Sequence, residues 1–151
     1  EIKPKGENLV IDIMPEQKKL LAENKYGATM RLGSYPAVLK KGTLAYEAYL
    51  SAEVLKKEDD KNEISERHRH RYEVNPEYIT DIENAGMIFS GTSPDNRLME
   101  IAELPKSVHP FFLGTQFHPE FKARPIHPLP LFSAFVEACL DDKKRKDTLF
   151  N

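Results

Sequence analysis

The sequence has one cysteine, no tryptophan and no long apolar run, and these shortages exclude several classes of protein. With Cys139 as the only thiol, an intrachain disulfide framework is impossible, which suits a reducing cytoplasm. No apolar stretch approaches the roughly 20 residues of a membrane span, and the opening E-I-K-P-K-G-E lacks the apolar core of a signal peptide. A formal charge of −2 gives no overall attraction to nucleic acid or membranes. We therefore expect a cytoplasmic protein with neither as a partner.

The composition that remains is that of an ordinary globular domain. The 151 residues are 40% hydrophobic and 30% charged, which is enough for one domain with a real core. Because residue 1 is a glutamate and not a methionine, we expect a piece of a longer chain.

Hydrophobic patterning predicts an α/β fold, a mixed sheet with flanking helices. Extended segments are expected at Leu9–Met14 and at Phe111–Phe117, and Met87–Thr92 should form an antiparallel hairpin with Leu98–Leu104. The segment Thr29–Lys40 is expected to contain two short extended pieces joined at Gly33, with Pro36 marking an edge or a turn. Helices are expected from Leu44 to about Lys57 after a Thr43 cap, and from Pro76 to a stop at Gly86.

A last helix is predicted by apolar residues spaced i, i+3, i+4, i+7 and i+8, namely Phe132, Phe135, Val136, Cys139 and Leu140. This spacing predicts a buried stripe, with Cys139 as a packed core residue and not a reactive thiol. The tail D-D-K-K-R-K-D-T-L-F-N is expected to fray.

Residues 64–75, I-S-E-R-H-R-H-R-Y-E-V-N, have the most unusual composition in the chain. In an extended segment, side chains alternate between two faces, so three arginines oppose two histidines and a tyrosine: Arg67, Arg69 and Arg71 against His68, His70 and Tyr72. The arginines are either solvated on an exposed edge or bind a carboxylate or phosphate, which suits the planar guanidinium fork. A metal site from the two histidines would need a third ligand, and no Cys or His lies nearby at zinc-finger spacing.

The triplet His118, Pro119 and Glu120 ends the apolar run from Phe111. Pro119 biases His118 toward an extended backbone, and side chains two apart in extended chain share a face. The Glu120 carboxylate can then hold one imidazole nitrogen as a proton donor and leave the other as a base that activates a nucleophile. The alternative is a surface histidine and glutamate beside a turn proline.

Three stretches together resemble the C-terminal part of the glutamine amidotransferase domain of the CTP synthase family. They are T-M-R-L-G at 29–33, R-H-R-H-R-Y-E-V-N at 67–75 and Q-F-H-P-E-F at 116–121. Q-F-H-P-E occurs across triad-type glutamine amidotransferases, whereas the other two point to CTP synthase among them. The resemblance implies that residues 1–151 are the C-terminal portion of a flavodoxin-like α/β domain.

The resemblance also implies roles for individual residues. It makes His118 the general base and Glu120 the residue that orients it. It assigns contact with the substrate glutamine to Arg71 and, from a single position at the chain end, to Glu1. It places Arg31 in a segment linked to activation by GTP, although an arginine between Met30 and Leu32 is equally compatible with a solvated strand residue.

The complete enzyme implied by this resemblance hydrolyses glutamine and uses the ammonia to convert UTP to CTP. We expect no cofactor in this chain, ATP, Mg and a GTP effector in the complete enzyme, and no metal ligand here. The expected partners are the synthase domain, the N-terminal half of the amidotransferase domain, and further copies in a homo-oligomer.

The chain departs from the family pattern at the nucleophile. The family has a cysteine in a G-x-C-L-G elbow, preceded by a glycine-rich oxyanion segment, and neither occurs here. We therefore expect this chain alone to be inactive. Two alternatives stay open: a non-catalytic amidotransferase remnant with a regulatory or assembly role, and another triad-type glutamine amidotransferase.

Overall fold

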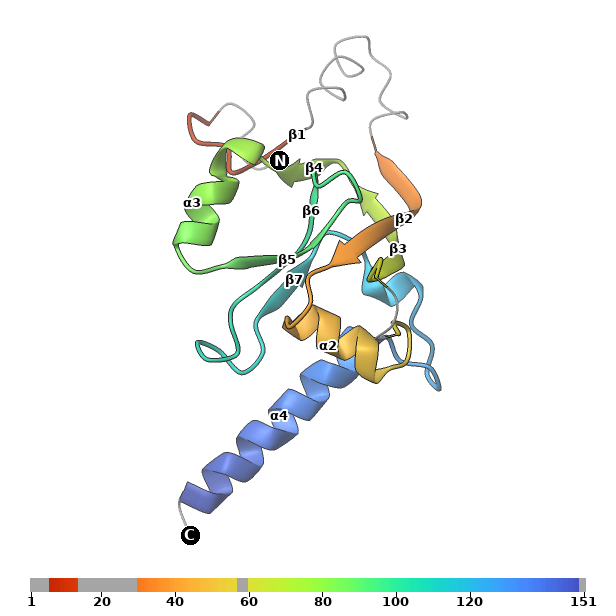
Figure 1. The fold of residues 1–151 in the computed structure, drawn as a ribbon, viewed down its shortest axis with the longest axis vertical. Coiled ribbons are helices and arrows are strands. Elements are labelled where there is room, and N and C mark those ends of the chain that lie inside the picture. The colour runs from red at the N-terminus through yellow and green to blue at the C-terminus, as the bar shows by residue number, and fades with distance from the viewer. Residues whose placement is uncertain (1–5, 14–29, 57–59, 150–151) are drawn as a thin grey trace.

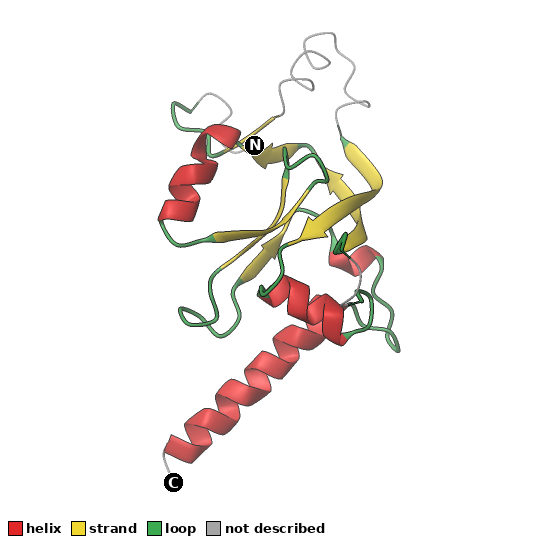
Figure 2. Ribbon diagram, viewed as in Figure 1, coloured by secondary structure: helices red, strands yellow, loops and turns green. Residues whose placement is uncertain are grey.

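The computed structural model describes residues 6–13, 30–56 and 60–149, and these form a curled antiparallel sheet with helices at its ends (Figures 1 and 2). The elements in order are β1 (Ile11–Ile13), β2 (Arg31–Leu39), α2 (Leu44–Ser51), β3 (Glu63–His70), β4 (Tyr72–Val74), η2 (Pro76–Tyr78), α3 (Ile79–Asn84), β5 (Ile88–Thr92), β6 (Met99–Glu103), β7 (Leu113–Thr115), η3 (Pro119–Phe121) and α4 (Pro130–Leu149). The predicted α/β class is confirmed. No helix in these described ranges has the length and apolarity to cross a membrane.

The main sheet has the strand order β3-β2-β5-β6-β7, and β1 pairs with β4 in a separate two-stranded sheet. Every pairing among the described strands is antiparallel, including the hairpin of β5 and β6 that the sequence predicts. In that hairpin a Cβ on Gly91 would lie 2.8 Å from Ile101 Cγ1, so the close approach at this bulge requires glycine. The described part of β7 pairs on one side only, with β6.

The prediction of two pieces joined at Gly33 is wrong, because β2 is a single strand of nine residues. Gly33 has φ of 103°, which glycine adopts without a steric penalty, and it stays in register opposite His68. Pro36 is tolerated because β5 pairs only with the end of β2, at Val38 and Leu39.

Helix α2 begins as predicted, with the Thr43 side chain accepting from the amide of Tyr46. Its N-terminus is also held by Glu103 of β6, whose carboxylate accepts from Leu44 N at 2.7 Å and Ala45 N at 3.1 Å. An acidic group is favourable there because the helix dipole is positive at that end.

The predicted end of α2 near Lys57 is wrong, because the helix stops at Ser51. Glu53 turns to φ of 58°, and the amide of Val54 bonds the Tyr49 carbonyl, which closes the last turn. This turn returns Leu55 to the core, where it is 4% exposed. The core cluster gathers the inner faces of β2 and α2 with the start of α4: Ala37, Leu39, Ala45, Tyr46, Ala48, Tyr49, Leu55, Ile64, Ile101, Phe117, Leu129 and Leu131.

The predictions of a buried stripe and of a packed Cys139 on the last helix are both wrong. Its apolar stripe is exposed, with exposed fractions of 42% for Phe132, 50% for Phe135, 54% for Val136 and 53% for Leu140, and Cys139 is exposed as well. The spacing located a genuine apolar face, but no described part of the chain buries it.

The tail does not fray at Asp141. Helix α4 continues to Leu149 and projects away from the sheet (Figure 1), with Asp142 paired to Arg145 at 2.8 Å and to Lys146 at 2.6 Å. Ion pairs at these i, i+3 and i, i+4 spacings support an exposed helix.

Candidate active site

His118 is held at the point where β7 has just ended and η3 begins. The preceding residue, Phe117, is 2% exposed and anchors the segment in the core. The amide of His118 donates to the carbonyl oxygen of Arg67 on β3 at 2.8 Å. The imidazole stacks on Phe121, with ring centroids 5.0 Å apart. The backbone at His118 is therefore fixed to the sheet, while its ring remains at the surface.

Glu120 lies beside His118 as predicted, with Oε1 2.9 Å from His118 Nδ1. The extended chain assumed for this pairing ends at His118, because residues 119–121 form the 3-10 helix η3. The hydrogen bond with His118 lowers the pKa of the Glu120 carboxyl, so the group is an ionised acceptor at neutral pH. An ionised acceptor fixes the proton on Nδ1 and leaves the lone pair of Nε2 as the basic position. The pair has the chemistry of a base with its orienting acid.

The expected alternation along residues 67–70 is confirmed, because Arg67 and Arg69 are exposed and His68 is buried. Arg71 does not continue it. Strand β3 ends at His70, and Arg71 lies half-buried in the bend before β4. Its Nε is buried and has no hydrogen-bond partner among the described residues.

Gln116 connects this bend to the His118 segment. Its Nε2 donates to the carbonyl oxygen of Tyr72, the residue after Arg71, and lies 3.2 Å from Glu73 Oε2. Because Gln116 stands two residues before His118, the structure brings the segments of the predicted base and the predicted substrate arginine together. Gln116 belongs to the recognised motif, but its role as this connection was missed from sequence.

Arg31 is buried, which rules out the solvated alternative for this residue. Its guanidinium lies 2.7 Å from Glu100 and 3.6 Å from Glu73, and it stacks 4.4 Å over the ring of Tyr35. Burial raises the pKa of both carboxyls, that of Glu73 to about 7, and Arg31 opposes this. Neither glutamate was assigned a role from sequence, although a charged residue at an inward strand position is a signal that could have found Glu100.

His68 and His70 complete this buried cluster. His68 Nδ1 lies 2.8 Å from His70 Nε2, and His68 Nε2 lies 3.7 Å from Glu100. Burial, and then the charge of Arg31, lowers the pKa of His68 to about 3 and that of His70 to about 4. Both imidazoles are therefore neutral at physiological pH. Among the described residues, no group of three or more His, Cys, Asp or Glu is placed to hold a metal ion.

The neutral state of His68 predicts a pH effect that a His68→Asn variant isolates. The folded protein keeps His68 unprotonated down to about pH 3, whereas the unfolded chain protonates it below about pH 6.5, so acidification favours unfolding. Glu73 acts in the opposite sense, because its raised pKa lets the folded state bind a proton first. Comparing variant with parent removes that contribution.

Between pH 7 and pH 5, we expect the free energy of unfolding to fall by about 2 kcal/mol less in His68→Asn than in the parent. Urea unfolding followed by circular dichroism at the two pH values measures this. Equal losses in parent and variant would mean that His68 is protonated in the folded protein.

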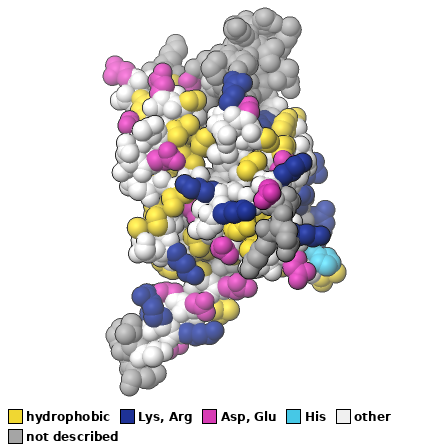
Figure 3. All heavy atoms as spheres, in the orientation of Figure 1, with side chains coloured by type: hydrophobic (Ala, Val, Ile, Leu, Met, Phe, Trp, Pro, Cys, Tyr) yellow, Lys and Arg dark blue, Asp and Glu magenta, His cyan; other side chains and the backbone are white. Residues whose placement is uncertain are grey.

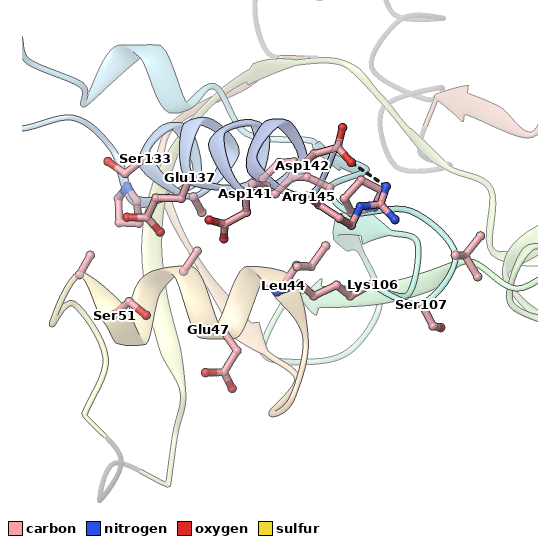
Figure 4. Close-up of a pocket in the computed structure, with 18 residues that line it drawn as sticks. Leu44, Glu47, Ser51, Lys106, Ser107, Ser133, Glu137, Asp141, Asp142 and Arg145 are labelled. Atoms are coloured by element: carbon pink, nitrogen blue, oxygen red, sulfur yellow. Dashed lines mark hydrogen bonds and ion pairs between the residues drawn. The ribbon is translucent and has the colours of Figure 1, made fainter. Parts of the chain in front are cut away.

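Glu1, the second predicted glutamine contact, lies outside the described residues. A groove of about 770 Å³ opens between α2, α4 and the loop at 106–111 (Figure 4), with Ser51 and Glu137 among the residues on its two sides. None of the predicted site residues lines this groove, so it is separate from the His118 region.

The fold and the His118–Glu120 pair match a class of enzyme: α/β proteins in which a histidine oriented by a carboxylate activates a nucleophile. Sequence comparison then gives the family. The chain matches the glutamine amidotransferase class-I family over residues 9–138, and it belongs to that family.

The relatives agree with the resemblance seen in the motifs. The chain is 59% identical over 131 residues to a CTP synthase of Rubrobacter xylanophilus, covering 87% of this chain and 21% of the relative. It is 50% identical over 148 residues to a CTP synthase of Pyrococcus abyssi, covering 97% of this chain and 25% of the relative. The predicted similarity to CTP synthase is confirmed, and the chain spans a quarter or less of these relatives.

A solved structure matches as well. The glutaminase domain of Trypanosoma brucei CTPS, solved with bound acivicin, superposes with a TM-score of 0.73 at 33% identity. The match covers 91% of this chain and 48% of that one.

Proposed function

We propose that this chain is the C-terminal part of the glutaminase domain of a CTP synthase, which hydrolyses glutamine to supply ammonia for the ATP-dependent amination of UTP. The observation that carries this is the His118–Glu120 pair at 2.9 Å, fixed on the segment that Gln116 connects to the Arg71 bend. The similarity to CTP synthases supports it independently.

In the proposed reaction, His118 takes the proton of a cysteine thiol through Nε2, and the thiolate attacks the carboxamide carbon of glutamine. The C–N bond breaks, and ammonia leaves with the proton that His118 returns. Water then hydrolyses the glutamyl thioester with the same base. The orientation of the His118 ring by Glu120 keeps Nε2 available in both steps.

The nucleophile of this scheme is a cysteine that the 151 residues do not supply. Cys139 stands on the exposed face of α4, on an element different from the one that positions His118. We propose that the thiol comes from the N-terminal half of the domain, and that this chain alone is inactive. ATP and Mg would act in the synthase domain of a homo-oligomeric, cytoplasmic enzyme.

Arg71 is proposed to contact the carboxylate of glutamine, together with Glu1 on the ammonium group. The half-buried position of Arg71 and its unbonded Nε support this role. Arg31 does not fit direct contact with GTP, because it is 8% exposed and paired with two carboxylates. Any effect of Arg31 on GTP activation would act through that buried cluster.

The proposal is tested by joining this chain to the half of a CTP synthase glutaminase domain that it does not match. The joined protein should release ammonia from glutamine, and the 151-residue chain alone should not. In the joined protein, Arg71→Ala should lower kcat/KM for glutamine roughly 10- to 150-fold. This factor corresponds to a loss of about 1.5 to 3 kcal/mol of transition-state stabilisation, the contribution of one charge-assisted hydrogen bond.

Arg71→Lys should recover little of this loss, since a point charge does not replace the fork. Arg69→Ala, which removes an exposed arginine of the same segment, is the matched control and should leave kcat/KM unchanged. No ammonia from the joined parent protein would refute the proposed function, and equal values for Arg71→Ala and the parent would remove Arg71 from the site.

A further inference from the structure

The acidic partner of His118 lies on a short and exposed piece of chain. Glu120 belongs to η3, a 3-10 helix of three residues, none of which is buried. The side chains of His118 and Glu120 are 36% and 56% exposed. An exposed pair of this kind contributes only about 0 to 1 kcal/mol. Their hydrogen bond is therefore too weak to set the position of Glu120, which has to come from the attachment of η3 to the sheet.

The outer edge of β3 provides that attachment at two carbonyl groups. Where η3 begins, the amide of His118 donates to the carbonyl oxygen of Arg67 at 2.8 Å. Where η3 ends, the ammonium group of Lys122 donates to the carbonyl oxygen of Ser65. Carbonyl groups two residues apart on a strand point to the same side. One strand edge therefore holds both ends of the segment that carries Glu120.

A buried carboxylate lies beside the second of these attachments. Glu66 is 3% exposed, and its Oε2 lies 3.8 Å from Lys122 Nζ. This oxygen accepts no hydrogen bond from any residue in the described ranges, whereas Oε1 accepts from the hydroxyl of Tyr49 on α2 at 3.0 Å. Burial raises the pKa of Glu66, and the charge of Lys122 opposes this. A buried carboxylate is costly unless a positive charge compensates it, and Lys122 is placed to do so.

The direction in which Lys122 points is informative because its surroundings are basic. Arg67 and Arg69 are exposed on β3, and Lys and Arg side chains gather on this side of the sheet (right in Figure 3). Like charges repel, so an ammonium group without acceptors would extend into solvent there. Lys122 instead turns to the backbone of Ser65 and to the buried Glu66.

We propose that Glu66 is a positioning residue of the amidotransferase site, acting through Lys122 on the position of Glu120. Glu66 holds the ammonium group against β3, and this contact holds η3 so that the Glu120 carboxylate meets Nδ1 of His118. The inference rests on the proposed function and adds a residue that contacts neither substrate nor nucleophile. Its effect is on the imidazole tautomer, because a fixed Glu120 keeps the proton on Nδ1 and the lone pair on Nε2.

The joined protein described above serves for the kinetic test. Lys122→Met should lower kcat for glutamine by about 10- to 100-fold, as when a group away from the chemistry misplaces a catalytic one, with KM within about twofold of the parent. Lys122→Arg should restore most of kcat, because a guanidinium can donate to both acceptors. Lys106→Met, which removes an exposed lysine of the loop between β6 and β7, is the matched control and should behave like the parent.

Glu66→Gln isolates the buried charge. The amide keeps the size of the side chain and an oxygen for the Tyr49 hydroxyl, but it no longer attracts Lys122 as a carboxylate does. This variant should lower kcat in the same direction as Lys122→Met, again without raising KM. The variant with both substitutions should match Lys122→Met within about twofold, because the two changes break one contact.

The tautomer of His118 is a readout that a purely structural role would not move. Long-range proton–nitrogen correlation spectra of isotope-labelled histidine distinguish a protonated from an unprotonated ring nitrogen, and His118→Ala identifies the signals of this residue. In the joined parent protein, Nδ1 should be the protonated nitrogen of the neutral ring. Glu66→Gln and Lys122→Met should mix the two tautomers, whereas Lys106→Met should leave them as in the parent.

A parent-like tautomer and kcat in Glu66→Gln would overturn the inference, as would an equal change in Lys106→Met. So would a loss of kcat that follows lower stability in urea unfolding while the tautomer is unchanged. The spectra do not depend on ammonia release. Mixed tautomers in Glu66→Gln and Lys122→Met, with no ammonia from the joined parent, would support the positioning of Glu120 and refute the proposed function. Ammonia release with unchanged tautomers in both variants would do the reverse.

Discussion

Replacement of His118 by alanine in a complete amidotransferase that contains this chain is expected to abolish glutamine-dependent product formation. The structure gives this residue a dedicated geometry, with Nδ1 bonded to Glu120 and the backbone fixed to Arg67 on β3. A general base that both activates the nucleophile and protonates the leaving ammonia contributes about 10²- to 10⁴-fold to the rate, so a loss of at least about 100-fold is expected.

The same variant should keep its activity with ammonia as the nitrogen source, because ammonia bypasses glutamine hydrolysis. Glutamine-dependent and ammonia-dependent rates are therefore measured side by side. His127→Ala, which removes an exposed histidine of the loop before α4, is the matched control and should affect neither rate. A parallel loss of both activities in His118→Ala would show that the substitution damages the fold, and would contradict the assignment.

The sequence predicted the local geometry of the His118–Glu120 pair because this geometry depends on short-range rules. A proline after the histidine favours an extended backbone at His118, and Glu120 is only two residues away. The Nδ1–Oε1 contact of 2.9 Å was therefore predicted, although Glu120 reaches His118 from the 3-10 helix η3 and not from the extended chain that the prediction assumed. The hairpin of β5 and β6, the Thr43 cap and the stop at Gly86 were predictable for the same reason.

The buried cluster around Arg31 could not be predicted in this way, because its members come from four separate strands. Arg31 of β2, His68 of β3, Glu73 of β4 and Glu100 of β6 approach one another only after the chain has folded. The motif containing Arg31 is visible in the sequence, but the carboxylates that neutralise it are not near it in the chain. Sequence patterning therefore left burial and solvation equally open for this arginine.

Helix α4 shows a different limit. Periodicity correctly located its apolar face, but periodicity contains no information about which polypeptide covers that face. The prediction of a buried stripe assumed that the cover lies within the 151 residues, and the exposure of Phe135 and Val136 shows that it does not lie in their described part. The error concerns the burial of this face and not the position of the helix.

The second large effect is expected on stability, from breaking the pair of Arg31 with Glu100. Removing Arg31 leaves the Glu100 carboxylate, which is 0% exposed, buried without this partner. Loss of one member of a buried pair costs about 3 to 5 kcal/mol. Arg31→Met should therefore lower the free energy of unfolding by about this amount. Arg69→Met, on the exposed face of the neighbouring strand, should change it by less than about 0.5 kcal/mol.

A double variant separates the loss of the pair from the loss of packing. In the protein that carries both Arg31→Met and Glu100→Leu, position 100 holds no unpaired charge. The nearby Glu73 has a pKa that burial raises to about 7, so it can lose its charge by protonation. The double variant should therefore recover about 2 kcal/mol or more relative to the sum of the single losses. Urea unfolding of the four proteins followed by circular dichroism measures the coupling. Additive losses would contradict a mutual neutralisation of Arg31 and Glu100, whereas recovery in the double variant would confirm it.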